Sequence, residues 1–454
     1  MKNLIPFKKI AKENLSPLSK DRRFGTDGIR GPVFSTMNPI FVTKLGWAAG
    51  SVLKEEGISK VLIGKDTRIS GYMLESALQA GFISSGMDVT LLGPLPTPGV
   101  SFLANSNNQV GVVISASHNL FEDNGIKFFN KNGQKLSSEL ENRIERKITQ
   151  DIMPVKSISL GKADRMNDAQ GRYIEFCKSS FSNLDLSGLS LLLDCANGAT
   201  YSVAPKVFEE LGATVHSVGV EPDGININQN CGSTNPENLR KEILKGNFDL
   251  GIAFDGDGDR VTTVSKEGKI LDGDDLLYIL SQGVNKHGGI VGTLMSNKSL
   301  EVHFDEVNIE FIRANVGDKY VLEKLLEKGW SLGGEPSGHI LCLDAAPTGD
   351  AIIAALKLLD SLQVSNFDIE SSLRGFNKFP QTLINLNVGD PNRIIINSNF
   401  WSEVTEIERK LSDKGRVLIR PSGTEPLIRI MVESESQHAA EDYANHLAKV
   451  ASEI

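Results

Sequence analysis

The sequence predicts three similar α/β domains with mixed, largely parallel sheets, followed by a smaller C-terminal α+β domain. Short apolar runs alternate with amphipathic helical stretches, an order that is typical of βαβ units. The alternation recurs three times along the 454 residues, and the last part of the chain departs from it. We therefore expect four domains, at residues 1–155, 156–260, 261–370 and 371–454.

The individual elements are predicted from residue type and from the spacing of apolar residues. Runs of β-branched and aliphatic residues predict strands, and apolar residues at helical spacing predict helices. The first domain is expected to have strands at 61–64, 88–92 and 110–114 and a helix over 73–83, and the second, strands at 189–194, 213–218 and 248–254 and a helix through 208–211. The third is expected to have strands at 290–295 and 309–312 and helices near 321 and over 351–362, and the fourth, strands at 383–388 and 417–420, an apolar run at 427–432 and helices over 401–411 and 438–450.

Composition argues against several classes of protein. The net charge is −9, whereas a nucleic-acid surface needs clustered Lys and Arg, so we expect no nucleic-acid partner. No apolar run approaches the roughly 18 residues of a membrane helix, and the first 15 residues lack the apolar core of a signal peptide, so we expect no membrane association. The four cysteines are widely spaced, which favours buried free thiols in a cytoplasmic protein.

The stretch FDGDGDR at 254–260 carries three alternating carboxylates. Asp255, Asp257 and Asp259 are hard oxygen ligands, and the glycines between them let the backbone bring all three onto one divalent cation. The alternative is a polar hairpin turn, which Asp-Gly pairs also favour. A calcium-binding EF-hand is excluded, because the sixth and twelfth loop positions hold arginine and lysine instead of Gly and Glu. Magnesium is the preferred ion.

The stretch GVVISASHN at 111–119 joins an apolar strand to a polar end. An apolar strand belongs inside a sheet, and ligands of α/β sheets gather at the carboxyl ends of strands. Alone, the Ser117-His118 pair fits a capped turn. Lys127 and a tight turn are expected just downstream, and a serine oxygen near a metal and a lysine is suited to carry phosphate. Ser117 is then the phosphate carrier, and Ser115 supports the loop.

The stretch RPSGTEPLIR at 420–429 has the composition of an anion-binding nest. Ser422 and Thr424 offer hydroxyls, and Gly423 lets backbone N–H groups approach a ligand. Arg420 and Arg429 supply forked donors for phosphate oxygens. The alternative is a polar surface turn.

Two glycine-rich stretches carry polar side chains. In GGEPSGH at 333–339, Glu335 and Ser337 can hold adjacent sugar hydroxyls, although an ordinary loop has the same composition. In FGTDGIRG at 24–31, Arg30 is a candidate for facing negative charge, although the glycines can serve turns alone.

In this order the motifs resemble those of the α-D-phosphohexomutase superfamily over nearly the whole chain, and its bacterial amino-sugar branch in particular. The matching stretches are FGTDGIRG, IGKDTRISG at 63–71, ISASHN with DNGIKFF, FDGDGDR, GGE-x-SGH, TGD at 348–350 and SGTEPLIRIMVE. Several ordered matches are much harder to obtain by chance than one. The resemblance implies a heart-shaped, four-domain enzyme arranged around one central cleft.

The resemblance also implies a role for each candidate residue. Ser117 is phosphorylated in the working enzyme, and one Mg²⁺ per active site lies beside it. The implied metal ligands are Ser117, Asp255, Asp257 and Asp259; Arg30 and Arg260 line the transfer site; His118 and Lys127 transfer protons or stabilise charge; Glu335 and Ser337 hold the sugar; and Arg420, Ser422, Gly423, Thr424 and Arg429 hold the phosphate that is not being transferred.

The implied reaction interconverts glucosamine 6-phosphate and glucosamine 1-phosphate, feeding UDP-N-acetylglucosamine and cell-wall synthesis. Phosphoserine gives its phosphoryl group to the free hydroxyl, and the resulting hexosamine 1,6-bisphosphate, both intermediate and activator, turns round and returns the other phosphate. Such transfer needs positioning and charge neutralisation in a site closed to water. The expected partner is a small phosphosugar, and a homodimer is the family expectation.

The sequence departs from the family pattern at a few positions. Pro336 stands where the amino-sugar enzymes usually have Gln, Leu120 where proline is usual, and Asn315 where a basic residue is common. Three alternatives therefore stay open: the same chemistry on glucose or mannose phosphates, a catalytically silent phosphosugar-binding protein, and a metal-dependent phosphatase.

Overall fold

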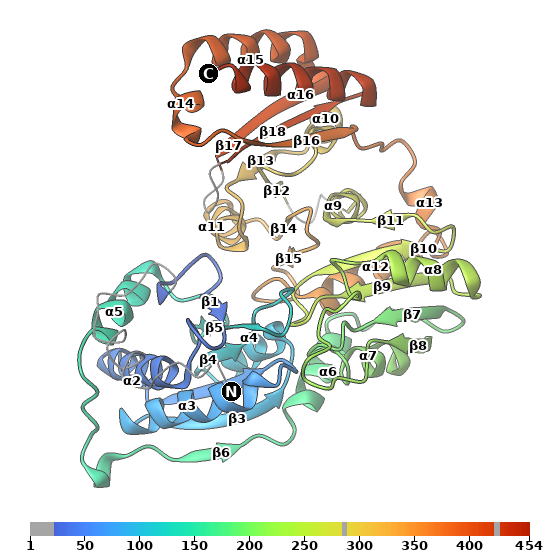
Figure 1. Cartoon of the computed structure of the whole chain (residues 1–454). Helices are drawn as coiled ribbons and strands as arrows, with labels where there is room; N and C mark the ends of the chain where they lie inside the picture. The colour runs from blue at the N-terminus through green and yellow to red at the C-terminus, as the bar shows by residue number, and fades with distance from the viewer. Residues whose placement is uncertain (1–21, 284–287, 422–426) are drawn as a thin grey trace, which may run out of the picture. The chain divides into compact units, whose positions relative to one another are not determined.

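The computed structural model describes residues 22–283, 288–421 and 427–454. The chain divides into two compact units. The first unit comprises Met1–Thr293 and Ala314–Ser372, and the second comprises Leu294–Arg313 and Leu373–Ile454. Figure 1 shows that both units combine helices with β-sheet.

The first sheet of the first unit has six strands in the order β1-β5-β4-β2-β3-β6. β2 is parallel to β3 and β4, whereas β5 runs antiparallel between β1 and β4. Strand β4 has the predicted bounds, and all five of its residues are buried, as an inner strand requires. The elements are β1 (Ile29–Pro32), α2 (Pro39–Glu55), β2 (Lys60–Lys65), α3 (Ser70–Ser84), β3 (Asp88–Pro94), α4 (Thr97–Ser106), β4 (Val110–Ile114), β5 (Asp123–Phe129), α5 (Ser138–Ile148), the short 3₁₀ helix η2 (Ser157–Ser159) and β6 (Ala163–Arg165).

Helices cover both faces of this sheet. Alternate residues of a strand point to opposite faces. Val61 and Ile63 of β2 therefore join the core made with α2, α3 and α5. On the opposite face Gly64 and Gly111 lie under Val100 of α4, and a β-carbon on Gly64 would lie only 2.4 Å from that side chain. The two glycines thus let α4 approach the sheet closely.

The second sheet has five strands in the order β11-β10-β9-β7-β8. β7 is parallel to β8 and β9, and β9 and β10 form an antiparallel hairpin in which Phe254 pairs with Val261. The loop 255–260 therefore joins two buried neighbouring strands. The elements are α6 (Ala169–Ser179), β7 (Ser190–Asp194), α7 (Ala204–Glu210), β8 (Thr214–Val218), α8 (Glu237–Lys245), β9 (Leu250–Phe254), β10 (Val261–Ser265) and β11 (Ile270–Leu271).

The rest of the first unit is built on β12, β14 and β15. β12 is parallel to β14, and β14 is antiparallel to β15. Two helices begin at aspartate caps: Asp272 and Asp275 form a capping box on α9, and Asp350 accepts hydrogen bonds from two backbone amides at the start of α12. The elements are α9 (Gly273–Ser281), β12 (Ile290–Thr293), α11 (Asp318–Lys328), β14 (Leu332–Gly334), β15 (Ile340–Cys342), α12 (Ala351–Gln363) and α13 (Ile369–Ser372).

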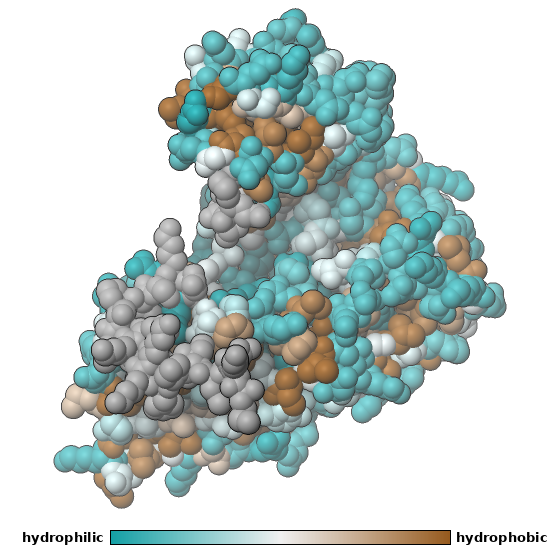
Figure 2. Space-filling model, in the orientation of Figure 1, coloured by the Kyte–Doolittle hydropathy of each residue, from teal (hydrophilic) through white to brown (hydrophobic). Residues whose placement is uncertain are grey.

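The second unit contains an antiparallel sheet in the order β16-β18-β17. Its core packs residues of this sheet against α15 and α16. In the view of the whole chain in Figure 2, the visible surface is largely hydrophilic with scattered apolar patches. The elements are α10 (Lys298–Glu306), β13 (Phe311–Ala314), whose last residue falls in the first unit, β16 (Gln381–Asn387), α14 (Pro391–Ile395), α15 (Ser398–Leu411), the 3₁₀ helix η4 (Ser412–Lys414), β17 (Gly415–Pro421), β18 (Leu427–Ser434) and α16 (Gln437–Ser452).

The predicted combination of α/β domains and a smaller α+β part is confirmed, with differences in detail. The stretch expected to hold a tight turn before Lys127 forms the antiparallel strand β5. Ile126, Phe128 and Phe129 in this strand are buried, so apolar packing outweighs the turn preference of the Asn-Gly pair. Among the described residues, no helix has both the length and the hydrophobicity needed to cross a bilayer.

Candidate active site

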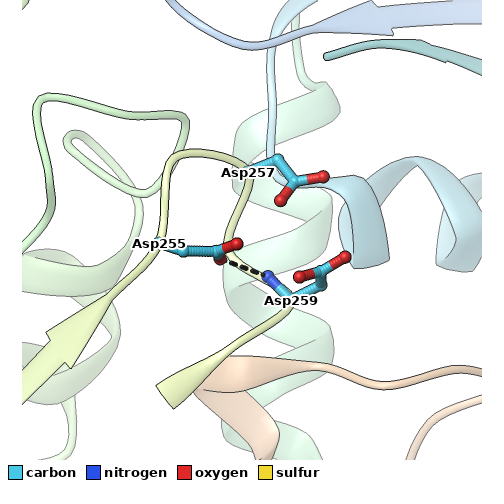
Figure 3. Close-up of side chains that lie close together, drawn as sticks. All are labelled: Asp255, Asp257 and Asp259. Carbon is cyan, nitrogen blue, oxygen red and sulfur yellow. Dashed lines mark hydrogen bonds between the residues drawn. The ribbon is translucent and has the colours of Figure 1, made fainter. Parts of the chain in front are cut away.

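The loop between β9 and β10 gathers three carboxylates. One oxygen from each of Asp255, Asp257 and Asp259 lies within 4.8 Å of the other two, and all three residues are buried (Figure 3). Gly258 has a φ of +73°, a conformation that glycine adopts without cost. The loop is therefore a hairpin connection, as the alternative interpretation proposed, and it also forms a buried acidic cluster.

The hydrogen bonding of these carboxylates is incomplete. Oδ1 of Asp255 accepts bonds from the backbone amides of Asp259 and Arg260, at 3.1 Å each. In contrast, Oδ1 of Asp257 and Oδ1 of Asp259 are buried and have no hydrogen-bond partner within the described ranges. Buried carboxylate oxygens without partners are costly, and a divalent cation satisfies them. The donor set therefore fits a metal ion with oxygen preference.

The three aspartates of this loop have different pKa values, because their surroundings differ in charge. Burial, with the charges of Asp259 and Asp257, raises the pKa of Asp255 well above its ordinary value. Burial also raises the pKa of Asp257 and Asp259, but the combined effect of their partners is larger, and the pKa of each falls below the ordinary value. These partners are Lys127 for both groups, with Thr97 at Asp257 and with His339 and Arg260 at Asp259. The site thus needs positive charge, and Lys127 supplies part of it.

Ser117 lies at the carboxyl end of β4, and its hydroxyl faces the acidic loop. Ser117 Oγ donates a 2.7 Å hydrogen bond to Oδ2 of Asp255. The residue is 1% exposed and has a φ of +50°, which is uncommon for a residue other than glycine. Ser115, as predicted, supports the loop: its hydroxyl donates to Asp66 at 2.6 Å and accepts from the Ser117 amide at 2.9 Å.

His118 lies beside this hydroxyl. Its Nδ1 is 3.5 Å from Ser117 Oγ. Burial and the positive charges of Arg260 and Arg30 lower the pKa of His118 to about 4. The imidazole is therefore neutral at physiological pH.

Lys127 connects the carboxylate loop with the N-terminal segment. Its ammonium lies 2.7 Å from Oδ2 of Asp257, 3.2 Å from Oδ2 of Asp259 and 2.9 Å from Oδ2 of Asp27. Burial lowers the pKa of Lys127, but the charges of Asp257 and Asp259 outweigh burial and raise it overall. Asp27 also pairs with Arg30. Arg30 and Lys127 are thus held together through one carboxylate.

Three further residues complete a ring of alternating charge. Lys135 Nζ lies 2.8 Å from Oδ1 of Asp27 and 2.7 Å from Oδ1 of Asp318. His339 lies 3.7 Å from both Asp318 and Asp259, which closes the ring through Lys127. Asp27 and His339 lay within quoted motifs, but sequence reasoning gave neither a role. Lys135 and Asp318 carried no signal in the sequence, because the contacts join distant segments.

The remaining candidates of the first unit lie near this network. Arg260 Nε is 3.9 Å from Oδ1 of Asp259. Glu335 is buried, and its Oε1 accepts a 2.9 Å hydrogen bond from the amide of Gly317. Ser337, two positions later, is exposed. The two predicted sugar ligands therefore differ in environment, although both lie on the connection between β14 and β15.

The predicted phosphate nest belongs to the second unit. Arg420 and Arg429 are cross-strand partners in the β17–β18 pair. Like charges directly opposite each other destabilise a sheet, so an anion between them would relieve the repulsion. Ser422, Gly423 and Thr424 lie outside the described residues.

The comparisons with known proteins agree with this site. Family models described as phosphoglucomutase/phosphomannomutase match the chain in four consecutive parts: alpha/beta/alpha domain I at residues 21–153, domain II at 171–268, domain III at 272–379 and the C-terminal domain at 383–450. The chain belongs to the phosphoglucomutase/phosphomannomutase family, a family of phosphosugar mutases.

Relatives with curated names are phosphoglucosamine mutases. The phosphoglucosamine mutase of Legionella pneumophila is 51% identical over 444 residues, covering 96% of this chain and 98% of the relative. The phosphoglucosamine mutase of Aeromonas hydrophila is also 51% identical, over 433 residues, covering 94% and 98%.

Solved structures share the fold. A phosphoglucomutase/phosphomannomutase family protein from Burkholderia thailandensis superposes with a TM-score of 0.81 at 25% identity, covering 96% of this chain and 98% of that one. An N-acetylphosphoglucosamine mutase from Aspergillus fumigatus, described in complex with GlcNAc-6P and magnesium, gives a TM-score of 0.69 at 16% identity, covering 98% of both chains.

Proposed function

We propose that the chain interconverts glucosamine 6-phosphate and glucosamine 1-phosphate, and so feeds UDP-N-acetylglucosamine and cell-wall synthesis in the cytoplasm. One observation carries the mechanism: the buried Ser117 hydroxyl is hydrogen-bonded to Asp255 in a cluster of three carboxylates. The amino-sugar assignment is supported by curated relatives named phosphoglucosamine mutases at 51% identity over nearly the full chain.

The reaction runs through phosphoserine at position 117. The oxygen of the free sugar hydroxyl attacks the phosphorus, the bond from phosphorus to Ser117 Oγ breaks, and the sugar becomes a 1,6-bisphosphate. After the bisphosphate turns round, Ser117 Oγ attacks the other phosphorus, the bond from that phosphorus to its sugar oxygen breaks, and Ser117 regains a phosphoryl group. The proton lost by the sugar hydroxyl is balanced by the proton that the released phosphosugar regains. Phosphoryl transfer of this kind depends on positioning and charge neutralisation.

A metal ion fits between the serine and the aspartates. Asp255, Asp257 and Asp259 would hold Mg²⁺ together with Ser117, and the bound ion supplies positive charge to the transferring phosphoryl group. The two buried aspartate oxygens without hydrogen-bond partners support this assignment. Magnesium is favoured because oxygen donors alone form the site.

The neighbouring side chains are assigned to proton transfer and to charge neutralisation. Neutral His118, whose Nδ1 is 3.5 Å from Ser117 Oγ, is assigned to accept the proton that the sugar hydroxyl loses. Lys127 is charged and buried beside two aspartates, so it neutralises charge rather than takes up a proton. Arg30 and Arg260 face the same region and suit the equatorial phosphoryl oxygens.

Substrate binding is assigned to two further groups. Glu335 and Ser337 hold sugar hydroxyls. Arg420 and Arg429, with Ser422, Gly423 and Thr424, grip the phosphate that is not being transferred. Because the bisphosphate must bind in two orientations, a grip separate from the transfer site lets either phosphate occupy it.

A mutase assay tests the proposal. Turnover is measured on glucosamine, glucose and mannose 6-phosphates, with and without Mg²⁺, for the natural chain, Ser117→Ala and the exposed-site control Ser106→Ala. We expect metal-dependent isomerisation with preference for the amino sugar, loss in Ser117→Ala and retention in the control. A clear preference for a neutral sugar would assign the alternative substrate that Pro336 leaves open. Net phosphate release without isomerisation would make the chain a phosphatase.

A further inference from the structure

The backbone carbonyls of Ser117 and Asn119 are held from two sides. Arg68 Nη2 donates to the Ser117 oxygen at 3.0 Å and to the Asn119 oxygen at 2.7 Å. The side-chain amide of Asn228 donates to the same two oxygens, at 2.8 Å and 2.9 Å. A carbonyl oxygen has two acceptor lone pairs, so both oxygens are fully used. Such saturation fixes the peptide planes that flank the serine.

Arg68 is committed entirely to this loop and its support. Its guanidinium is fully buried, and Nη1 donates to the carbonyl oxygens of Leu120 and, at 3.2 Å, of Asp123. Its Nε donates to Asp66 at 2.8 Å, and Asp66 also accepts the Ser115 hydroxyl. The planar guanidinium of Arg68 therefore donates to four carbonyl oxygens of this loop. The single ammonium group of a lysine cannot reach all four in this arrangement.

Asn228 reaches the loop from the segment between β8 and α8. It has a φ of +58°, which asparagine tolerates, and its backbone amide donates to the oxygen of Ala196 at 2.9 Å. The adjoining loop bonds the acidic hairpin, because the amide of Ala199 donates to the oxygen of Gly256 at 2.8 Å. Asn228 thus fastens the serine loop to the same support that holds the acidic loop.

Ser117 adopts a left-handed backbone conformation that L-residues other than glycine seldom adopt. In this conformation its hydroxyl lies 2.7 Å from Asp255. We propose that Arg68 and Asn228 are positioning residues that hold Ser117 in this conformation, so that Oγ stays aligned with Asp255 during phosphoryl transfer. The inference rests on the proposed mutase function. It assigns roles to two residues that the sequence motifs left without one.

The proposal makes a kinetic distinction. Neither side chain is assigned to the sugar, so the KM for the phosphosugar should change little when either is replaced. A misplacement of the nucleophile by about 1 Å can lower the rate about 100-fold. The effect should therefore fall on kcat and on the rate at which Ser117 takes up phosphate.

Variants of Asn228 provide the primary test. Asn228→Asp keeps the shape but replaces the donating amide group with a carboxylate oxygen, which repels the two carbonyl oxygens. Asn228→Gly removes both hydrogen bonds and tolerates the positive φ. The matched control is Asn230→Asp, since Asn230 is exposed and has nearly the same backbone, with a φ of +56°. We expect both Asn228 variants to lose about 100-fold in kcat with KM changed by less than about twofold.

Arg68→Lys provides the second arm, with exposed Arg146→Lys as its control. Lysine keeps the charge opposite Asp66 and gives up most of the carbonyl bonds, so kcat should fall while the chain stays folded. Because both side chains hold the same two oxygens, the double variant Arg68→Lys/Asn228→Gly should be non-additive in kcat.

The readouts are kcat, KM, melting temperature and the rate of Ser117 phosphorylation by a hexose 1,6-bisphosphate, followed by intact mass. Unchanged kcat in Asn228→Asp relative to Asn230→Asp would overturn the positioning role, as would a fall in melting temperature with normal kcat in Asn228→Gly. A natural chain that neither isomerises any phosphosugar nor takes up phosphate would overturn the proposed function itself, and the positioning role with it.

Discussion

The Ser117 hydroxyl meets Asp255, a residue 138 positions later, across a 2.7 Å hydrogen bond. Ser117 follows β4 of the first sheet, and Asp255 follows β9 of the second. Both strands thus end at the same place, and side chains at carboxyl ends of inner strands meet there. The candidate nucleophile and the candidate metal ligands therefore come from two different sheets.

Metal binding should depend on the carboxylate of Asp257. Mg²⁺ at about 100 times its dissociation constant should stabilise the natural chain by about 2.7 kcal/mol, because the ion binds the folded form. Asp257→Asn removes one negative ligand, and thermal unfolding with and without Mg²⁺ should show a much smaller shift. The exposed-site control Asp413→Asn should respond like the natural chain. Equal shifts in all three proteins would contradict the assignment.

Lys127 should contribute strongly to stability in the absence of added metal. Lys127→Met leaves Asp27, Asp257 and Asp259 without their shared cation, and removing one partner of a buried ion pair costs about 3–5 kcal/mol. Urea unfolding should report this loss, and the exposed-site control Lys131→Met should not. A loss below about 0.5 kcal/mol, typical of surface substitutions, would contradict the network.

Asp350 should make stability fall as pH rises. Burial raises the pKa of Asp350 from 3.8 to about 6, although amides of α12 and the Tyr173 hydroxyl oppose the shift. The folded state therefore keeps this proton to higher pH than the unfolded state, and the contribution is lost between pH 3.8 and about 6. Asp350→Asn keeps a capping oxygen without the charge.

The free energy of unfolding of Asp350→Asn, relative to the natural chain, should therefore rise by about 3 kcal/mol across that window, at 1.36 kcal/mol per pKa unit. Denaturant titrations at a series of pH values measure this difference. A difference that is independent of pH would show that Asp350 ionises alike in both states.

Arg429 should act on substrate capture more than on chemistry. A hydrogen bond to a charged group contributes about 1.5–3 kcal/mol, so Arg429→Gln should raise KM for the phosphosugar by at least about tenfold. Steady-state kinetics with the exposed-site control Arg409→Gln measure this effect. An unchanged KM would remove Arg429 from the phosphate grip.

Local patterns in the sequence predicted elements and ligand types well. The bounds of β4 follow from an unbroken apolar run, and the acidic cluster follows from the Asp-Gly alternation. The tight turn predicted before Lys127 is wrong, because the turn preference of the first residues of β5 is visible in the sequence and the burial of its later residues is not. The domain boundaries, the central cleft and the homodimer stay predictions.

Local patterns in the sequence did not predict contacts between distant segments, and only the family resemblance implied that Ser117 lies beside Asp255. Arg68 lies 49 residues from Ser117, and Asn228 lies 111 residues from it, yet both hold its carbonyl. Lys135 meets Asp318 across 183 residues. No periodicity or composition encodes such pairs, since they arise only when the sheets and loops pack together.

The most direct test of the account is the mass of the intact protein after incubation with a hexose 1,6-bisphosphate and Mg²⁺. The natural chain should gain one phosphoryl group on Ser117 and lose it again when glucosamine 6-phosphate is added, while Ser117→Ala gains none. A chain that isomerises glucosamine 6-phosphate without ever carrying phosphate on Ser117, or a Ser117→Ala variant with full activity, would contradict it.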